Sequence, residues 1–128
     1  MEAAAEPLVY CLTRDRELAE AVEAALSGAL AFFYNDAARL RQAVILRGPE
    51  IVVIDTGAVR EEYGDAGLGP EVEFLREHVP AARIAVRPMA GSERLIQAEA
   101  GAEVALLPAE QAGCVAALAV LCSRAVLS

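Results

Sequence analysis

The stretch Gly48-Pro49-Glu50-Ile51-Val52-Val53-Ile54-Asp55 decides the fold of this chain. It contains an unbroken run of β-branched apolar residues, which is typical of a strand buried on both faces of a parallel sheet. The glycine and proline before the run indicate a turn that leads into the strand. Asp55 ends the run, and the carboxyl ends of such strands line the crevice where open α/β sheets bind ligands or carry out chemistry. Asp55 is therefore the first candidate site residue.

Around this strand the sequence alternates between short apolar runs and segments with helical spacing. The apolar runs predict strands over residues 8–12, 30–34, 51–54, 83–86 and 104–107. Each strand is followed by a segment of helical periodicity, and the start signals are Asp15, Asn35 or Asp36, Pro70, Ser92 and Glu110. Residues 56–69 are polar and rich in glycine, and they are too numerous for an ordinary strand-to-helix turn of about 2–6 residues. This segment is predicted to be a loop.

These elements predict an α/β fold, a doubly wound parallel sheet of five strands with five helices, in one domain over residues 1–128 with a core at about 7–126. Right-handed crossovers favour the flavodoxin-like strand order, in which the first and third strands are neighbours. Asp55 should then face the turn formed by Thr13 and Arg14.

Composition excludes several classes of protein. Hydrophobic residues make up 56% of the chain and charged residues 23%, which excludes disorder, and the formal net charge of −8 without a basic cluster argues against a nucleic acid ligand. No apolar run approaches the roughly 20 residues that a membrane span needs. The first residues lack the features of a signal peptide, so a cytoplasmic location is expected. The three cysteines, Cys11, Cys114 and Cys122, have no metal-binding spacing and are expected to be reduced, buried thiols.

The run from Gly48 to Asp55, the five strand–helix units and the stretch Glu99-Ala100-Gly101-Ala102 resemble the receiver domain of two-component response regulators. The resemblance covers about residues 7–126. In that family the aspartate at the position of Asp55 accepts a phosphoryl group. Transfer to a carboxylate needs Mg²⁺, which is held by further carboxylates.

The other functional positions of the family have changed in this sequence. Thr13 and Arg14 stand where the family has an acidic pair, and Asp15 lies one residue further on. Arg87 aligns with the hydroxyl residue that follows the fourth strand, and Leu107, before Pro108, aligns with the lysine that follows the fifth. The resemblance therefore implies a degenerate phospho-acceptor site with no catalytic residue, metal ion or cofactor, in a protein that is not an enzyme. We expect an arginine, Arg14 or Arg87, to pair with Asp55 in place of the metal.

Two other interpretations stay open. In the first, the chain is a true phospho-accepting receiver in which Asp15 and Asp55 together hold Mg²⁺. In the second, it is an enzyme or nucleotide-binding protein that uses the crevice at the strand ends, although no glycine-rich phosphate loop follows any strand.

The last helix is apolar almost all round, because Arg124 is the only charged residue between 112 and 127. Small residues on this helix would let another helix approach closely. The predicted interface consists of three of these small residues and one valine: Ala112, Ala116, Ala119 and Val120. We expect a protein partner and a homodimer through this face, or alternatively coverage by chain beyond Ser128. A receiver without phosphoryl chemistry resembles a constitutive interaction module. One similar group is the atypical N-terminal receiver of pilus-assembly localisation proteins, which precedes a ParA-like ATPase.

Overall fold

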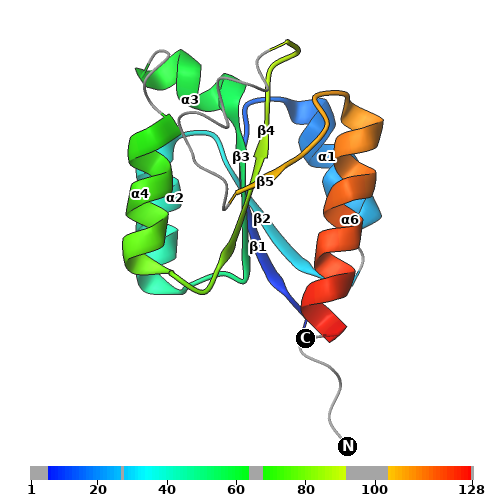
Figure 1. The fold of residues 1–128 in the computed structure, drawn as a ribbon, viewed down its shortest axis with the longest axis horizontal. Coiled ribbons are helices and arrows are strands. Elements are labelled where there is room, and N and C mark those ends of the chain that lie inside the picture. The colour runs from blue at the N-terminus through cyan, green and yellow to red at the C-terminus, as the bar shows by residue number, and fades with distance from the viewer. Residues whose placement is uncertain (1–5, 27, 64–67, 92–103, 128) are drawn as a thin grey trace, which may run out of the picture.

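A computed structural model of the chain describes residues 6–26, 28–63, 68–91 and 104–127. All five strands lie in one parallel sheet with the order β2-β1-β3-β4-β5 (Figure 1). The strands are β1 (Leu8–Leu12), β2 (Leu30–Tyr34), β3 (Ile51–Asp55), β4 (Arg83–Arg87) and β5 (Ala105–Leu106). The predicted fold class and strand order are therefore confirmed, and only β5 is shorter than the sequence suggested.

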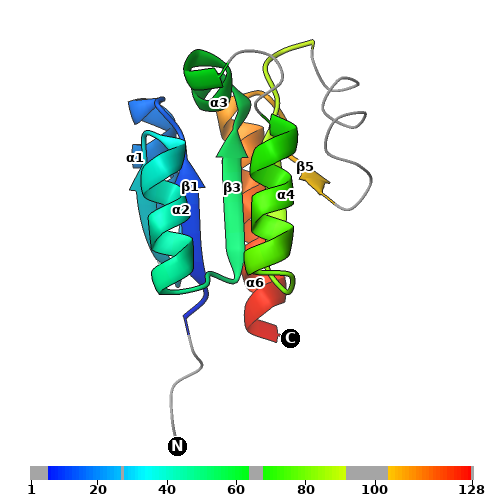
Figure 2. The ribbon, with the colours of Figure 1, turned by 90° about the vertical axis from the view of Figure 1, so that its left-hand side faces the viewer.

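Helices cover both faces of this sheet. Five helices are described: α1 (Arg16–Ala25), α2 (Ala37–Leu46), α3 (Thr56–Tyr63), α4 (Leu68–His78) and α6 (Gln111–Leu127). The helices α1 and α6 lie on one face, α2 and α4 lie on the other, and α3 sits at the carboxyl end of β3 (Figures 1 and 2). Within the described residues no helix is long and apolar enough to cross a membrane.

The strands β1 and β3 are buried along their whole length, and their side chains alternate between the cores on the two faces of the sheet. Val9, Cys11 and Val53 pack against α1 and α6, whereas Tyr10, Leu12 and Ile54 belong to the core under α2 and α4. Fully burying one aliphatic side chain of this size contributes about 1.5–3 kcal/mol. The three cysteines are free and buried, as expected.

Aspartates begin the first two helices. The carboxylate of Asp15 accepts a hydrogen bond from the backbone N of Leu18 at 3.2 Å, and that of Asp36 accepts from the backbone N of Arg39 at 2.8 Å. Both are N-cap interactions that satisfy a backbone donor in the first turn. The structure thus selects Asp36 over Asn35 as the cap of α2.

The loop predicted over residues 56–69 is wrong for its first half, because Thr56–Tyr63 is the helix α3. The helix starts directly after β3, and Asp55 Oδ1 accepts a hydrogen bond from the backbone N of Gly57 at 3.3 Å. Ala58 and Val59 are each 2% exposed and pack into the core under α2 and α4, which stabilises the helix despite Gly57. The next helix begins at Leu68 rather than Pro70, and the helix predicted from Ser92 lies outside the described residues.

An ion pair between a partly exposed arginine and a buried glutamate joins α2 to α4. Glu71 of α4 has a side chain that is 1% exposed, and Arg41 of α2 donates to both of its oxygens. The Arg41 guanidinium carbon also lies 5.2 Å from the centre of the Phe74 ring. This pair fixes α2 against α4 on one face of the sheet.

Candidate functional site

The site predicted from the sequence assembles at the carboxyl ends of the three central strands. Asp55 ends β3 and stands beside Arg87, its register partner on β4. Thr13 directly follows β1, the neighbour of β3 on the other side. Asp55 and Thr13 are 8% and 5% exposed, so both are polar groups buried at the strand ends.

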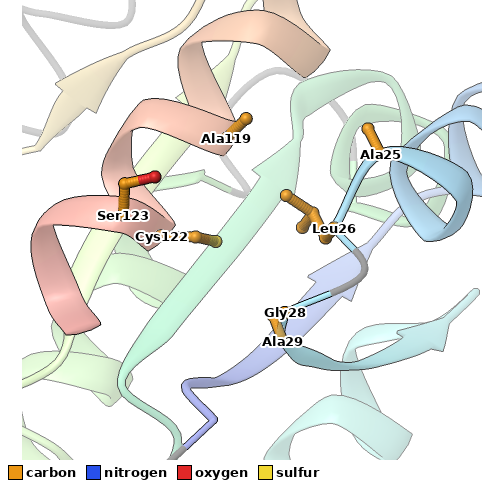
Figure 3. Close-up of a pocket in the computed structure, with 7 residues that line it drawn as sticks. All are labelled: Ala25, Leu26, Gly28, Ala29, Ala119, Cys122 and Ser123. Atoms are coloured by element: carbon orange, nitrogen blue, oxygen red, sulfur yellow. The ribbon is translucent and has the colours of Figure 1, made fainter. Parts of the chain in front are cut away.

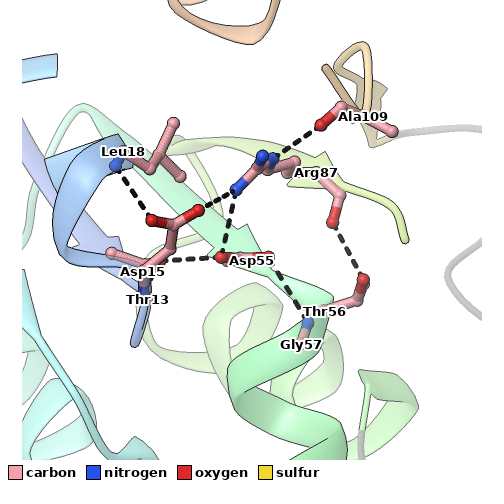
Figure 4. A network of polar contacts seen from close by, with 8 residues as sticks. All are labelled: Thr13, Asp15, Leu18, Asp55, Thr56, Gly57, Arg87 and Ala109. Carbon is pink, nitrogen blue, oxygen red and sulfur yellow. Dashed lines mark hydrogen bonds and ion pairs between the residues drawn. The ribbon is translucent and has the colours of Figure 1, made fainter. Parts of the chain in front are cut away.

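Two hydrogen bonds and one ion pair hold the carboxylate of Asp55 (Figure 4). The hydroxyl of Thr13 donates to Oδ2 at 2.7 Å, and the backbone N of Gly57 donates to Oδ1 at 3.3 Å. Arg87 Nη1 lies 3.5 Å from Oδ2. Burial of a carboxylate is costly unless it is paired and hydrogen-bonded, and these contacts meet that requirement.

Arg87 connects Asp55 to two other parts of the fold. The same Nη1 donates to Asp15 Oδ2 at 3.2 Å, and Nε donates to the backbone O of Ala109 at 3.0 Å. The side chain of Arg87 is only 14% exposed. One guanidinium therefore holds two carboxylates and the turn before α6 (Figure 4).

The pKa of Asp15 lies below its usual value. The capping hydrogen bond from the backbone N of Leu18 is the largest cause, and the hydrogen bond and charge of Arg87 add to it. Both causes favour the charged carboxylate, which is the form that pairs with Arg87.

The resemblance to receiver domains raises the question of Mg²⁺, and the residues present do not fit it. Asp15 and Asp55 each direct an oxygen at the same nitrogen of Arg87, so an ion bridging those oxygens would have to take the place of a cation already present. The third group at this point is the Thr13 hydroxyl, which donates to Asp55 instead of supplying a negative charge. Mg²⁺ is usually held by one or two carboxylates and water, without a competing cation. The described residues also contain no group of three histidine, cysteine or acidic side chains suited to a metal.

Two residues that the resemblance placed in the degenerate site, Arg14 and Leu107, do not contact Asp55. Arg14 is exposed, and its Nε donates to the backbone O of Asn35 at 2.8 Å. The ion pair with Asp55 comes from Arg87. Leu107 is 3% exposed and packs in the core under α1 and α6, where an apolar side chain is stable and a charge would not be.

A buried thiol lies behind the site. Burial is the largest cause that raises the pKa of Cys11, and the negative charge of Asp55 raises it further. The thiol therefore stays protonated at neutral pH. Because the thiolate is the nucleophilic form, Cys11 is a core residue here.

The predicted interface residues on α6 divide between two environments. Ala112, Ala116 and Val120 are exposed, and Val120 is 52% exposed. Ala119 is half-buried and lines a pocket of about 250 Å³ between α6 and the end of α1, together with Leu26 and Cys122 (Figure 3). The outward stripe thus consists of Ala112, Ala116 and Val120.

Sequence reasoning missed two features near the site. Thr56 supports Arg87, because its hydroxyl donates to the backbone O of Arg87 at 2.9 Å. A hydroxyl residue directly after a strand-end aspartate is a helix-start signal that could have indicated this role. A second pocket of about 360 Å³ lies at the ends of β1 and β2, lined by Thr13, Phe33, Tyr34, Asn35 and Arg39.

Comparison with known proteins agrees with this geometry at the level of the fold. No family model and no curated protein matches the sequence. Among solved structures, a protein assigned as a response regulator from Chloroflexus aurantiacus matches with a TM-score of 0.70 at 19% identity, over 94% of this chain and 100% of that chain. The pseudo-receiver domain of the CikA protein matches with a TM-score of 0.59 at 14% identity, over 97% of this chain and 98% of that one. The chain therefore has a receiver-domain fold.

Proposed function

We propose that this chain is a non-catalytic pseudo-receiver that acts as a protein–protein interaction module in signalling. The observation that carries the proposal is the position of Arg87, whose Nη1 contacts both Asp15 and Asp55. A guanidinium is a positively charged group that donates hydrogen bonds and accepts none. It occupies the place where a receiver would need a metal ion between its acids.

The remaining substitutions also weaken phosphoryl chemistry. A phosphoryl group transferred to Asp55 would lie beside the Thr13 hydroxyl and Arg87. The family's lysine, which would contact that group, is replaced here by the buried Leu107. Loss of one preorganised electrostatic partner typically costs about 3 kcal/mol of transition-state stabilisation. Loss of the metal and of the lysine-like charge together would slow the transfer by several orders of magnitude.

The alternative is a phospho-accepting receiver with Asp55 as the acceptor. It is favoured by the closeness of the two carboxylates, since Asp15 and Asp55 reach the same nitrogen atom. One cation can therefore contact both acids. For Mg²⁺ to do so, the Arg87 side chain would have to leave its contacts with Asp15, Asp55 and Ala109.

Phosphoryl-donor chemistry separates the two functions. We expect acetyl phosphate or beryllofluoride with millimolar Mg²⁺ to leave the intact mass and the amide NMR spectrum unchanged. A stoichiometric adduct that disappears in Asp55→Asn would establish the alternative. Arg87→Thr serves as the matched variant: it restores a hydroxyl and removes the competing cation, so Mg²⁺ should shift the amide signals near Asp15 and Asp55 in this variant and not in the unmodified chain.

The outward stripe of α6 is the proposed homodimer surface. The inner side of α6 is formed by the buried residues Cys114, Leu118 and Cys122. Its outer side carries three exposed residues at the same spacing of four: Ala112, Ala116 and Val120. Small side chains on this side let a second helix approach closely. A specific dimer usually buries about 800 Å² on each partner.

Sedimentation velocity tests this surface. We expect the unmodified chain to be dimeric at tens of micromolar, and Ala116→Glu or Val120→Glu to be monomeric and folded. Ala38→Glu, the same change at an exposed position of α2, should leave the dimer intact. A monomeric unmodified chain would remove α6 from the proposal.

A further inference from the structure

Of the sulfur-containing side chains in the described residues, only that of Met89 is exposed. Met89 is 42% exposed and lies two residues after β4. The three cysteines are buried, and burial is the largest cause that raises the pKa of each thiol. Because the thiolate is the form that oxidants attack, these cysteines react slowly at neutral pH. An oxidant in solution would therefore meet Met89 first.

A guanidinium on α3 contacts this sulfur. In Figure 2, α3 and the segment that follows β4 lie at the same end of the sheet. Arg60 of α3 donates through Nη1 to Met89 Sδ at 3.4 Å. A thioether sulfur is only a weak acceptor, so this contact contributes little to holding α3 in place.

The same side of α3 contacts the segment after β4 at a second point. Thr56, four residues before Arg60, donates to the backbone O of Arg87 at 2.9 Å (Figure 4). Residues four apart lie on one face of a helix, so α3 runs along the stretch from Arg87 to Met89. One end of this contact is an ordinary hydrogen bond, and the other is the weak bond to sulfur. A chemical change at Met89 would act on the weak end.

Oxidation of Met89 by hydrogen peroxide would make this weak contact stronger. A sulfur lone pair attacks one peroxide oxygen, so that an S–O bond forms and the O–O bond breaks. The hydroxide that leaves takes the proton of the transferred oxygen and becomes water. The sulfur thus loses two electrons, which the peroxide gains. The product is a polar sulfoxide, and its oxygen is a much better acceptor than the thioether for the charged donor of Arg60.

We propose that Met89 is an oxidation site for hydrogen peroxide, and that Arg60 binds the resulting sulfoxide and so fastens α3 to the segment that follows β4. The exposure of Met89 gives the oxidant access, and the contact with Arg60 places a donor for the new oxygen. Neither Asp55 nor α6 takes part in this contact. The modification is therefore independent of phosphoryl transfer and of the proposed dimer.

Peroxide treatment followed by amide hydrogen exchange tests the proposal. The unmodified chain is treated with millimolar hydrogen peroxide, and peptide mapping distinguishes Met89 from Met1, the other methionine of the sequence. We expect Met89 to gain one oxygen while the three cysteines remain thiols. Amide exchange in α3 should then be slower by about threefold or more than in the untreated chain, because a hydrogen bond to a charged group opposes local opening.

Three variants separate this contact from other effects of peroxide. In Met89→Leu the sulfur is absent, so the treatment should leave exchange in α3 unchanged. In Arg60→Leu, at an exposed position where the change should not affect folding, Met89 should still be oxidised but exchange in α3 should not slow. Arg83→Leu, an exposed arginine at the other end of β4, is the matched control and should respond like the unmodified chain.

Three results would overturn the proposal. The first is a Met89 that stays unoxidised under conditions that fully oxidise Met1. The second is unchanged or faster exchange in α3 of the oxidised chain. The third is an equal slowing in Arg60→Leu, which would show that the guanidinium does not bind the sulfoxide.

Discussion

Replacing Arg87 with methionine tests whether this residue substitutes for a metal ion in holding the acids together. Methionine keeps an unbranched apolar chain about as long as the methylene part of arginine, while removing the guanidinium with its charge and all its donors. The change leaves Asp55 with the Thr13 hydroxyl and the backbone N of Gly57 as donors and without a counter-charge. It also removes the hydrogen bond to the backbone O of Ala109.

The expected loss of stability follows from burial. The Arg87 and Asp55 side chains are 14% and 11% exposed, and breaking a fully buried ion pair costs about 3–5 kcal/mol. Partial access to water reduces this cost, the lost Ala109 bond adds about 1 kcal/mol, and the pair with the more exposed Asp15 adds only a few tenths. We expect Arg87→Met to lower the free energy of unfolding by about 3 kcal/mol, a large part of the 5–15 kcal/mol typical of a domain.

Urea unfolding followed by circular dichroism measures this loss, and a double-mutant cycle isolates the pair. Asp55→Asn removes the charge but keeps an oxygen for Thr13, so Arg87→Met should cost about 1–2 kcal/mol less in that background. Arg83→Met, at the exposed opposite end of β4, is the control and should change stability by less than about 0.5 kcal/mol. Equal effects of the Arg87 and Arg83 variants, with no coupling to Asp55, would refute the role assigned to Arg87.

Three further outcomes are expected. The pKa of Asp15 is lowered in the folded chain, so its charge favours folding above about pH 3.9 and this contribution is lost as the pH falls. The variant Asp15→Asn, which still caps α1, should therefore lose less stability in acid than the unmodified chain. Thermal unfolding at a series of pH values measures this, and an unchanged acid profile would contradict it. Burial raises the pKa of Cys11, so above about pH 8.5 the unfolded chain loses a proton that the folded chain keeps, and stability should decline. Between about pH 8 and 10 the urea midpoint of Cys11→Ala should fall less steeply than that of the unmodified chain. Parallel pH profiles of the two proteins would count against this role of Cys11. Arg41→Met leaves the carboxylate of Glu71, 1% exposed, without its partner and should lower the free energy of unfolding by about 3 kcal/mol. Adding Glu71→Leu should restore most of this loss in the double variant. If the effects of the two changes on urea unfolding are purely additive, the pair does not have this role.

The strands and their order could be predicted from the sequence because each depends on local patterns and one topological rule. The run Ile51–Ile54 can only be a strand buried on both faces, and right-handed crossovers then place it beside β1. The helix α3 could not be predicted in this way. Its start depends on Asp55 acting as a helix cap, whereas the polar, glycine-rich composition of residues 56–69 favours a loop.

The candidate site was predictable in its members and not in its connections. Strand order brings Thr13, Asp55 and Arg87 together, since all three follow or end adjacent strands. Which arginine pairs with Asp55 depends on the path of a long side chain, and Arg14 instead contacts Asn35 on the surface.

The bond from Arg87 to Ala109 has a consequence for how such a domain could change during evolution. The turn that contains Ala109 is already crowded, since a Cβ atom on Gly113 would lie 3.0 Å from the Cβ of Pro108. Arg87 therefore anchors the start of α6 at a turn that is already closely packed. A lineage that lost this arginine would at once loosen the turn before the helix that we propose as the homodimer surface. Loss of Arg87 would therefore need a compensating change at this turn.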